Sequence, residues 1–233
     1  MLTALPPRVY IPFRIRITCD PGYLRTLDMK IISAFVLALA AVPAVSSASQ
    51  MVEIAPFIGH RYGGNFSDIY TSAEFEVADA RAFGLILDFD TEPDKQIEIY
   101  LSRQNTRLTA TGTFTGNPLF DLTIDYYHIG GLYMFPTDEL PAAIHPFVSG
   151  TIGLTRMVPK RSDLTTENRL SASLGVGAKY FFSKNAGMRF DVRGIYTAVN
   201  SDTAIFCSGG CTIWYSSSGF VQTEVNAVLM MRF

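Results

Sequence analysis

Charged side chains are scarce in this chain. They make up 17% of its 233 residues, against the roughly 25% typical of soluble globular domains. Hydrophobic residues make up 48%, so part of the folded surface must face something other than water. The net charge of -2 leaves no excess of lysine and arginine for the basic face that nucleic-acid binding requires. We therefore exclude nucleic acid as a partner.

Long apolar runs are also lacking. Beyond the N-terminal region, no stretch approaches the ~18 consecutive apolar residues that a membrane-spanning helix needs. The mean hydropathy of +0.20 nevertheless indicates a membrane. Because every backbone polar group must be paired inside a bilayer, the remaining membrane structure is a closed β-barrel. The chain length suits one such domain.

The N-terminal region predicts export. After Met29 the chain has one basic residue, Lys30, and then an apolar stretch over 31–42. The small residues Ser46-Ser47-Ala48 follow. This pattern is typical of a secretory signal peptide over 29–48, cleaved before Ser49. Residues 1–28 then precede a complete signal, and we interpret them as a start codon assigned too early, with a long n-region as the alternative. The mature domain is expected to span 49–233.

Cysteine is rare, with three in the chain. Cys19 lies upstream of the predicted signal peptide, so Cys207 and Cys211 form the only mature pair. Export to an oxidising compartment favours a disulfide between them, with free thiols as the alternative. A metal site is less favoured, because two thiols leave zinc short of ligands and the three histidines are scattered. No cofactor is predicted.

Alternation of apolar and polar residues with period two predicts strands throughout the mature chain. The pattern is clearest over 170–182, 188–198 and 221–233. Weaker versions bring the total to about eight, which suits a closed antiparallel transmembrane barrel of the all-β class. The five weaker segments are 52–61, 75–89, 96–103, 120–135 and 144–157.

The predicted connections alternate in length. Short turns are expected at 90–95, 136–142 and 183–187. Longer polar loops are expected at 63–72, 104–119, 159–168 and 200–218. Short periplasmic turns and longer outer loops are typical of outer-membrane barrels, so both mature termini are expected in the periplasm.

Alternation alone does not say which face points inward, because a soluble lipocalin-type barrel has the same period with its faces exchanged. Low charge, apolar faces almost free of ions and aromatic residues near segment ends favour the membrane. Those aromatic residues are Tyr126, Phe135, Tyr180, Phe182 and Phe233. This reading places His128 on the lipid face, as an interfacial residue or at a local bulge.

The chain resembles the OmpA-like and OmpX-like family of small outer-membrane barrels. Residues 145–155, 174–193 and the terminal Phe233 carry the resemblance, which covers about 52–233. It implies a bacterial outer-membrane location but no single activity, because the family includes anchors, adhesins and proteins of unknown role. Leu229, Met231 and Phe233 also resemble the signal read by the barrel-assembly machinery, so that machinery and outer-membrane lipid are the expected partners.

Charged residues on the inward faces are predicted to form a lumen ladder. Its members are Glu53, Glu98, Lys179, Arg189, Asp191, Arg193, Glu224 and Arg232. Their signs are mixed, so paired ions can offset one another's desolvation. An eight-strand interior is just filled by side chains, which favours a plug over a conduit. A narrow channel for small apolar molecules remains the alternative.

Catalysis is not predicted. Lipid A deacylases are enzymes built on small outer-membrane barrels, and they have a His-x-Ser spacing. That spacing is absent here, because His128 is followed by Ile129 and Gly130. No nucleophile, base and orienting group can be assembled, although a lipid-modifying enzyme stays as an alternative. The expected role is structural or interactive. Trp214 and Tyr215 in the last loop are candidates for binding an unknown surface ligand, or members of the aromatic girdle.

Overall fold

The computed structural model describes residues 51–67, 74–111, 118–136, 141, 143–199 and 219–233. These residues belong to one compact unit, Ser47–Phe233. None of the described residues forms a helix long and apolar enough to cross a membrane.

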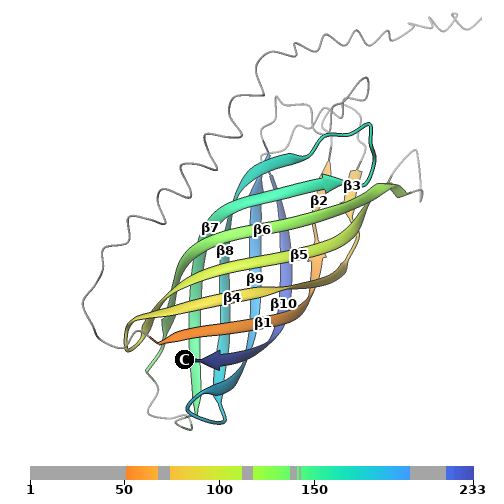
Figure 1. Cartoon of the computed structure of the whole chain (residues 1–233). Coiled ribbons are helices and arrows are strands. Elements are labelled where there is room, and N and C mark those ends of the chain that lie inside the picture. The colour runs from red at the N-terminus through yellow and green to blue at the C-terminus, as the bar shows by residue number, and fades with distance from the viewer. Residues whose placement is uncertain (1–50, 68–73, 112–117, 137–140, 142, 200–218) are drawn as a thin grey trace, which may run out of the picture. The chain divides into compact units, whose positions relative to one another are not determined.

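Eight long antiparallel strands form a closed ring (Figure 1). β1 pairs with β10, with Glu53 opposite Arg232, and β5 pairs with β6, so no edge of the ring is left unpaired. This confirms the predicted eight-strand closed barrel. The strands are β1 (Val52–Gly63), β4 (Ala80–Glu92), β5 (Lys95–Thr111), β6 (Pro118–Met134), β7 (Ile144–Pro159), β8 (Glu167–Phe181), β9 (Ala186–Ala198) and β10 (Gly219–Arg232).

Two short strands extend the ring at one end. β2 (Asn65–Ser67) follows β1 after Gly64, whose φ of +111° lies in a region that glycine tolerates. β3 (Glu74–Val77) pairs with β5 beyond β4, with Val77 opposite Leu108. We call this end, where the longer connections lie, the loop end, and the opposite end, which holds Phe233 and the short turns, the turn end.

The prediction of a loop over 104–119 is wrong for much of its length. β5 continues to Thr111 and β6 begins at Pro118, so each strand has 17 residues. Leu108 lies in this extended section opposite Phe120 of β6, and both side chains are buried inside the barrel. The barrel wall is therefore taller on this side than the sequence pattern indicated.

Side chains alternate between the inside of the barrel and its outer wall, as a pleated sheet requires. The predicted faces are wrong in β6. Tyr126 and His128 are 0% and 2% exposed and point inward, so neither belongs to a girdle or a lipid face. Phe135, Tyr180, Phe182 and Phe233 are exposed.

Candidate functional site

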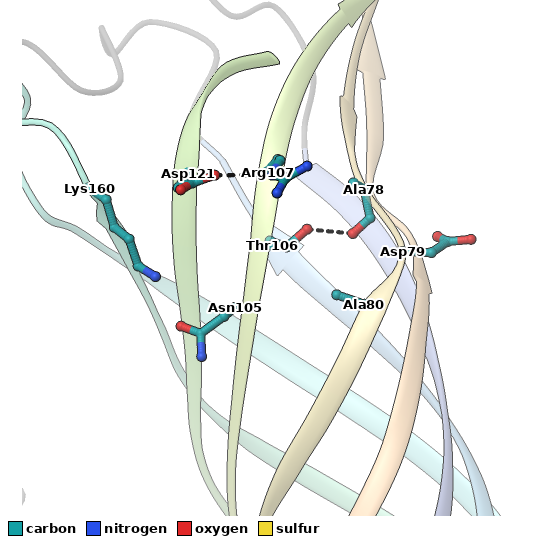
Figure 2. Close-up of a pocket in the computed structure, with 8 residues that line it drawn as sticks. All are labelled: Ala78, Asp79, Ala80, Asn105, Thr106, Arg107, Asp121 and Lys160. Carbon is teal, nitrogen blue, oxygen red and sulfur yellow. Dashed lines mark hydrogen bonds and ion pairs between the residues drawn. The ribbon is translucent and has the colours of Figure 1, made fainter.

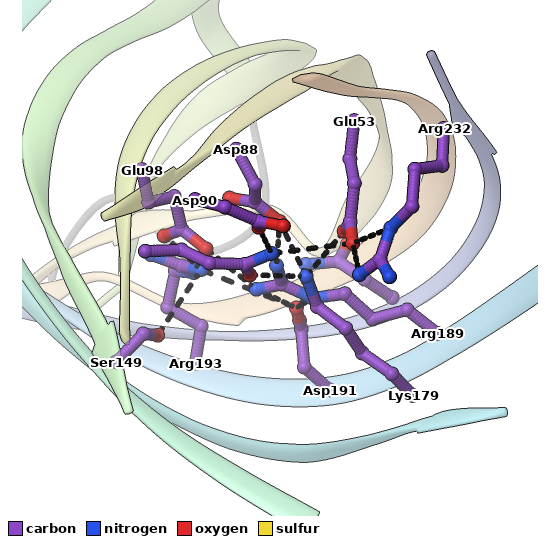
Figure 3. Close-up of polar contacts among 12 residues, drawn as sticks. Glu53, Asp88, Asp90, Glu98, Ser149, Lys179, Arg189, Asp191, Arg193 and Arg232 are labelled. Carbon is purple, nitrogen blue, oxygen red and sulfur yellow. Dashed lines mark hydrogen bonds and ion pairs between the residues drawn. The ribbon is translucent and has the colours of Figure 1, made fainter. Parts of the chain in front are cut away.

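Ten ionised side chains are joined inside the barrel, five basic and five acidic. Figure 3 shows the part of this set that surrounds Lys179, Arg189 and Arg193. The eight residues of the predicted ladder are all brought together here, with two more that the sequence reasoning missed, Arg61 and Asp88. The set is Glu53, Arg61, Asp88, Glu98, Lys179, Arg189, Asp191, Arg193, Glu224 and Arg232. We call it the lumen ion network.

Lys179 anchors the network toward the turn end. Its Nζ lies 2.5 Å from Glu53 Oε2 and 2.8 Å from Asp88 Oδ2, and it donates to Gln96 Oε1 at 2.6 Å. All three ionised side chains have no exposed surface. Glu53 is also paired with Arg232, the inward residue of the last strand. Each charge here therefore has an oppositely charged partner, which a buried ion requires.

Glu98 joins two arginines in the middle of the barrel. Its Oε2 lies 2.8 Å from Arg189 Nη2, and its Oε1 lies 2.8 Å from Arg193 Nη2. The Arg189 guanidinium stacks 4.4 Å above the ring of Phe147, and Arg193 stacks 4.3 Å above Tyr100. Each guanidinium is thus held by a carboxylate at its edge and by an aromatic ring at its face.

Arg61 and Glu224 continue the network toward the loop end. Arg61 Nε donates to Glu224 Oε2 at 2.7 Å, and the Tyr100 hydroxyl also donates to Glu224. Asn226 Nδ2 donates to Glu224 Oε1 and to Asp191 Oδ1, at 2.8 and 2.9 Å. Through Asn226 this pair joins the Glu98 group, so one set of contacts runs through the middle of the barrel.

Some of the ion pairs cross the lumen. In the ring order, β8 and β4 are four strands apart in either direction, as are β9 and β5. Lys179 with Asp88, and Arg193 with Glu98, therefore join diametrically opposite walls. An eight-strand barrel leaves room inside for little more than its own side chains. These cross-links fill that room and hold the opposite walls at a fixed separation.

An apolar cap closes the barrel above the lumen ion network. Its inward side chains are at most 9% exposed, and they belong to one cluster against which Leu164 also packs. The sequence pattern did not predict an apolar section of the lumen, although of the cap residues only Leu108 lies in a predicted loop. The cap consists of Val77, Leu108, Phe120, Leu122, Ile124, Met157, Ile195, Val199 and Phe220.

His128 and Ser171 form a buried pair inside the barrel. His128 Nε2 lies 2.7 Å from Ser171 Oγ, and Nδ1 lies 3.0 Å from Thr151 Oγ1. The two atoms have the separation of a base and a nucleophile, which sequence spacing did not reveal. Thr151 lies where a catalytic histidine would have an orienting carboxylate. The side chains of His128 and Ser171 are at most 6% exposed. The pair therefore fits a role in packing better than one in catalysis.

The outer wall carries an apolar band. On β8, Leu170, Leu174 and Val176 are 70%, 77% and 58% exposed, and Phe190 on β9 is 54% exposed. Such large apolar side chains are stable on a surface only when something apolar covers them. With a charged interior and an apolar exterior, the barrel has the polarity of a membrane protein, the reverse of a soluble lipocalin-type barrel.

The sequence matches the family described as Outer membrane protein beta-barrel domain over residues 34–233. The chain belongs to this family. Membership confirms the family predicted from the sequence and places the protein in the bacterial outer membrane. No curated protein matches the chain.

Solved structures of small outer-membrane barrels share the family's fold. The crystal structure of neisserial surface protein A has 10% identity and a TM-score of 0.55, covering 81% of this chain and 100% of its own. The solid-state NMR structure of outer membrane protein AlkL in lipid bilayers has 11% identity and a TM-score of 0.57, covering 82% of this chain and 94% of its own. At these identities, the likeness concerns the fold alone.

The remaining predicted site residues fall into two groups. Leu229, Met231 and Phe233 are exposed on the outer wall near the turn end, and their role in assembly stays a prediction. The predicted disulfide and loop residues lie outside the described residues, as do segments 1–28 and 29–48. Those residues are Cys207, Cys211, Trp214 and Tyr215. Among the residues that the structure describes, no cluster of His, Cys, Asp or Glu could hold a metal ion.

Proposed function

We propose that this protein is a closed, non-conducting anchor that has a structural or surface-interaction role through its outer loops. The observation that carries the proposal is the lumen ion network, in which Lys179 with Asp88 and Arg193 with Glu98 join opposite walls and have no exposed surface. We infer that the turn end faces the periplasm and the loop end faces outward, because outer-membrane barrels have short periplasmic turns.

The apolar cap is the observation that favours a second candidate, a narrow path for small apolar molecules. Its side chains are, however, packed against one another, and Ile124 and Ile195 have no exposed surface. The ionised residues beneath it would also oppose the passage of an apolar solute. We therefore infer that the cap is a packed core at the outer end of the barrel.

Planar-bilayer recording tests the closed anchor directly. We expect no steady conductance from folded wild-type protein, because the lumen is filled by paired side chains. Protease protection of the same preparation checks that the barrel has inserted, and a porin of known conductance is the positive control. Reproducible open currents, or uptake of small apolar solutes by vesicles that scales with the amount of folded protein, would refute the proposal.

A surface role predicts that binding depends on residues 200–218. In a screen against extracellular-matrix proteins and glycans, replacing Trp214 and Tyr215 by alanine should remove most of the wild-type signal, because aromatic anchors dominate many interfaces. Arg161→Ala, in the neighbouring loop, is the control. Both variants should keep the gel mobility of a folded barrel. Equal binding by wild type and the double variant would contradict the role of this loop.

A further inference from the structure

Basic residues gather on one side of the outer wall toward the loop end. Arg81 on β4, Arg103 on β5 and Arg156 on β7 are exposed, and each follows an apolar stretch of outward side chains. Two more basic residues lie further toward the loop end: Arg107 is four residues beyond Arg103, and Lys160 is four residues beyond Arg156. We call these five residues the outer basic patch. On β1, β8, β9 and β10, the described outward positions near this end hold no lysine or arginine.

Strand pairing makes the patch continuous. Arg103 is opposite Asp125 on β6, and Asp125 is opposite Arg156 on β7. On the other side, Arg103 is opposite Phe83 of β4, two residues from Arg81. The three arginines therefore lie within two residues of one register across the four neighbouring strands β4 to β7.

The height of the patch corresponds to lipid headgroups. A strand tilted by about 40° rises roughly 2.5 Å per residue along the barrel axis. The ten steps from Arg81 to Thr91 then span about 25 Å, the height of the apolar band of such barrels. Lys95 lies at the turn end of the same band, eight residues from Arg103. The patch thus lies at the membrane surface that the loop end faces.

Part of the patch retains unneutralised charge. Arg103 makes a bidentate pair with Asp125, at 2.6 and 2.9 Å, and Arg107 Nε lies 3.2 Å from Asp121 Oδ1. Within the described part of the chain, no ion pair involves the other three basic residues. These are Arg81, Arg156 and Lys160. Counting five basic residues against Asp79, Asp121 and Asp125 leaves an excess of two positive charges.

A groove lies within the patch (Figure 2). It has a volume of about 300 Å³ and is lined by Asp79, Asn105, Arg107, Asp121 and Lys160, among others. The Arg107 and Asp121 pair lies between Asp79 on one side and Lys160 on the other (Figure 2). The Lys160 backbone nitrogen donates to the Asp121 carbonyl at 2.8 Å, which fixes the start of the Lys160 side chain. The hollow therefore offers the donors of Asn105, Arg107 and Lys160 beside the carboxylates of Asp79 and Asp121, and it is large enough for an ionic headgroup.

We propose that the outer basic patch binds the phosphorylated headgroup of an outer-leaflet glycolipid. Arginine and lysine are the residues that recognise phosphate oxygens. Directly below the patch, Phe83, Leu101 and Leu154 continue the same outer wall as apolar surface for acyl chains. The patch and the band together match a ligand with an anionic head and an apolar tail. The site does not depend on whether the lumen conducts.

The test measures lipid binding by the folded full-length protein in detergent, using native mass spectrometry. The probes are diphosphoryl lipid A, its dephosphorylated form and inorganic phosphate. The variant is Arg81→Gln with Arg156→Gln and Lys160→Gln. The control is Lys95→Gln with Lys184→Gln, which removes exposed basic residues at the turn end.

We expect the triple variant to bind diphosphoryl lipid A more than about tenfold more weakly than wild type, because each basic residue near a lipid surface adds to its attraction for anionic lipid. The control should match wild type, and dephosphorylated lipid A should not distinguish the variants. Equal binding by wild type and the triple variant overturns the site. So does an equal loss in the control, or displacement of the lipid by millimolar phosphate, which would indicate a soluble anion as the occupant. If the triple variant fails to fold, Arg156→Gln and Lys160→Gln are compared singly.

Discussion

Replacing Lys179 by methionine should lower the free energy of unfolding by about 3 kcal/mol, the low end of the ~3–5 kcal/mol expected when one partner of a buried ion pair is removed. Methionine keeps most of the side-chain length but leaves Glu53 and Asp88 without their shared cation. The loss is limited because Glu53 keeps Arg232, and Asp88 keeps Arg189 at 3.3 Å. Urea unfolding in lipid vesicles, followed by circular dichroism, measures the change.

A second substitution distinguishes lost pairing from lost packing. Adding Asp88→Asn to Lys179→Met should recover part of the stability, because the carboxylate left without Lys179 is then uncharged. Arg189 still has Glu98 and Asp191 in the double variant. Lys184→Met, in an exposed turn, is the control and should change stability by less than about 0.5 kcal/mol. If Lys179→Met is as stable as wild type, the lumen is hydrated enough to solvate both carboxylates.

The inward ladder in β8, β9 and β10 was predictable because the outward faces of these strands are apolar over most of their length. One face of each meets lipid and the other meets the lumen, so a single alternation places Lys179, Arg189 and Glu224 on the inside. Period two is most informative where both environments stay constant along the strand. The same condition explains why these three segments gave the clearest pattern.

β6 does not meet that condition. Its first half lies beyond the apolar band, where the inside is the apolar cap and the outside is polar. Phe120, Leu122 and Ile124 are therefore inward, while Asp121 and Asp125 are outward. The polarity of the two faces reverses along one strand. If a single alternation is applied to the whole strand, His128 falls on the same face as Phe120, Leu122 and Ile124. Because that apolar face is expected to meet lipid, the alternation places His128 on the wrong side of the barrel wall.

The pairing across the lumen could not be derived from alternation. Alternation places a residue inside, but the partner depends on the order of the ring and on the relative shift of the strands. Arg61 and Asp88 have the correct inward parity in β1 and β4, yet their strands include inward apolar residues such as Phe57 and Ile86, which weaken the pattern. Closing the ring is what brings Asp88 opposite Lys179.

Replacing Leu122 by aspartate should destabilise the barrel by about 3 kcal/mol or more, because it buries a carboxylate without a partner. Leu122 is 1% exposed, and its neighbours in the cap are apolar. Urea unfolding in vesicles measures the loss. The matched control is Leu119→Asp on the same strand, where the side chain is 37% exposed, and there we expect little change.

The comparison decides what the loop end of the barrel is. If Leu122→Asp does not fold, Leu122→Ala gives the same information, because a well-packed core loses about 2–5 kcal/mol when leucine is truncated. Stability unchanged in both variants would mean that the cap is a water-filled vestibule open to the outside. Such a vestibule would make the lumen ion network the only barrier to passage. A large loss in Leu122→Ala, together with an unaffected Leu119→Asp, would instead make the cap a second closure above that network.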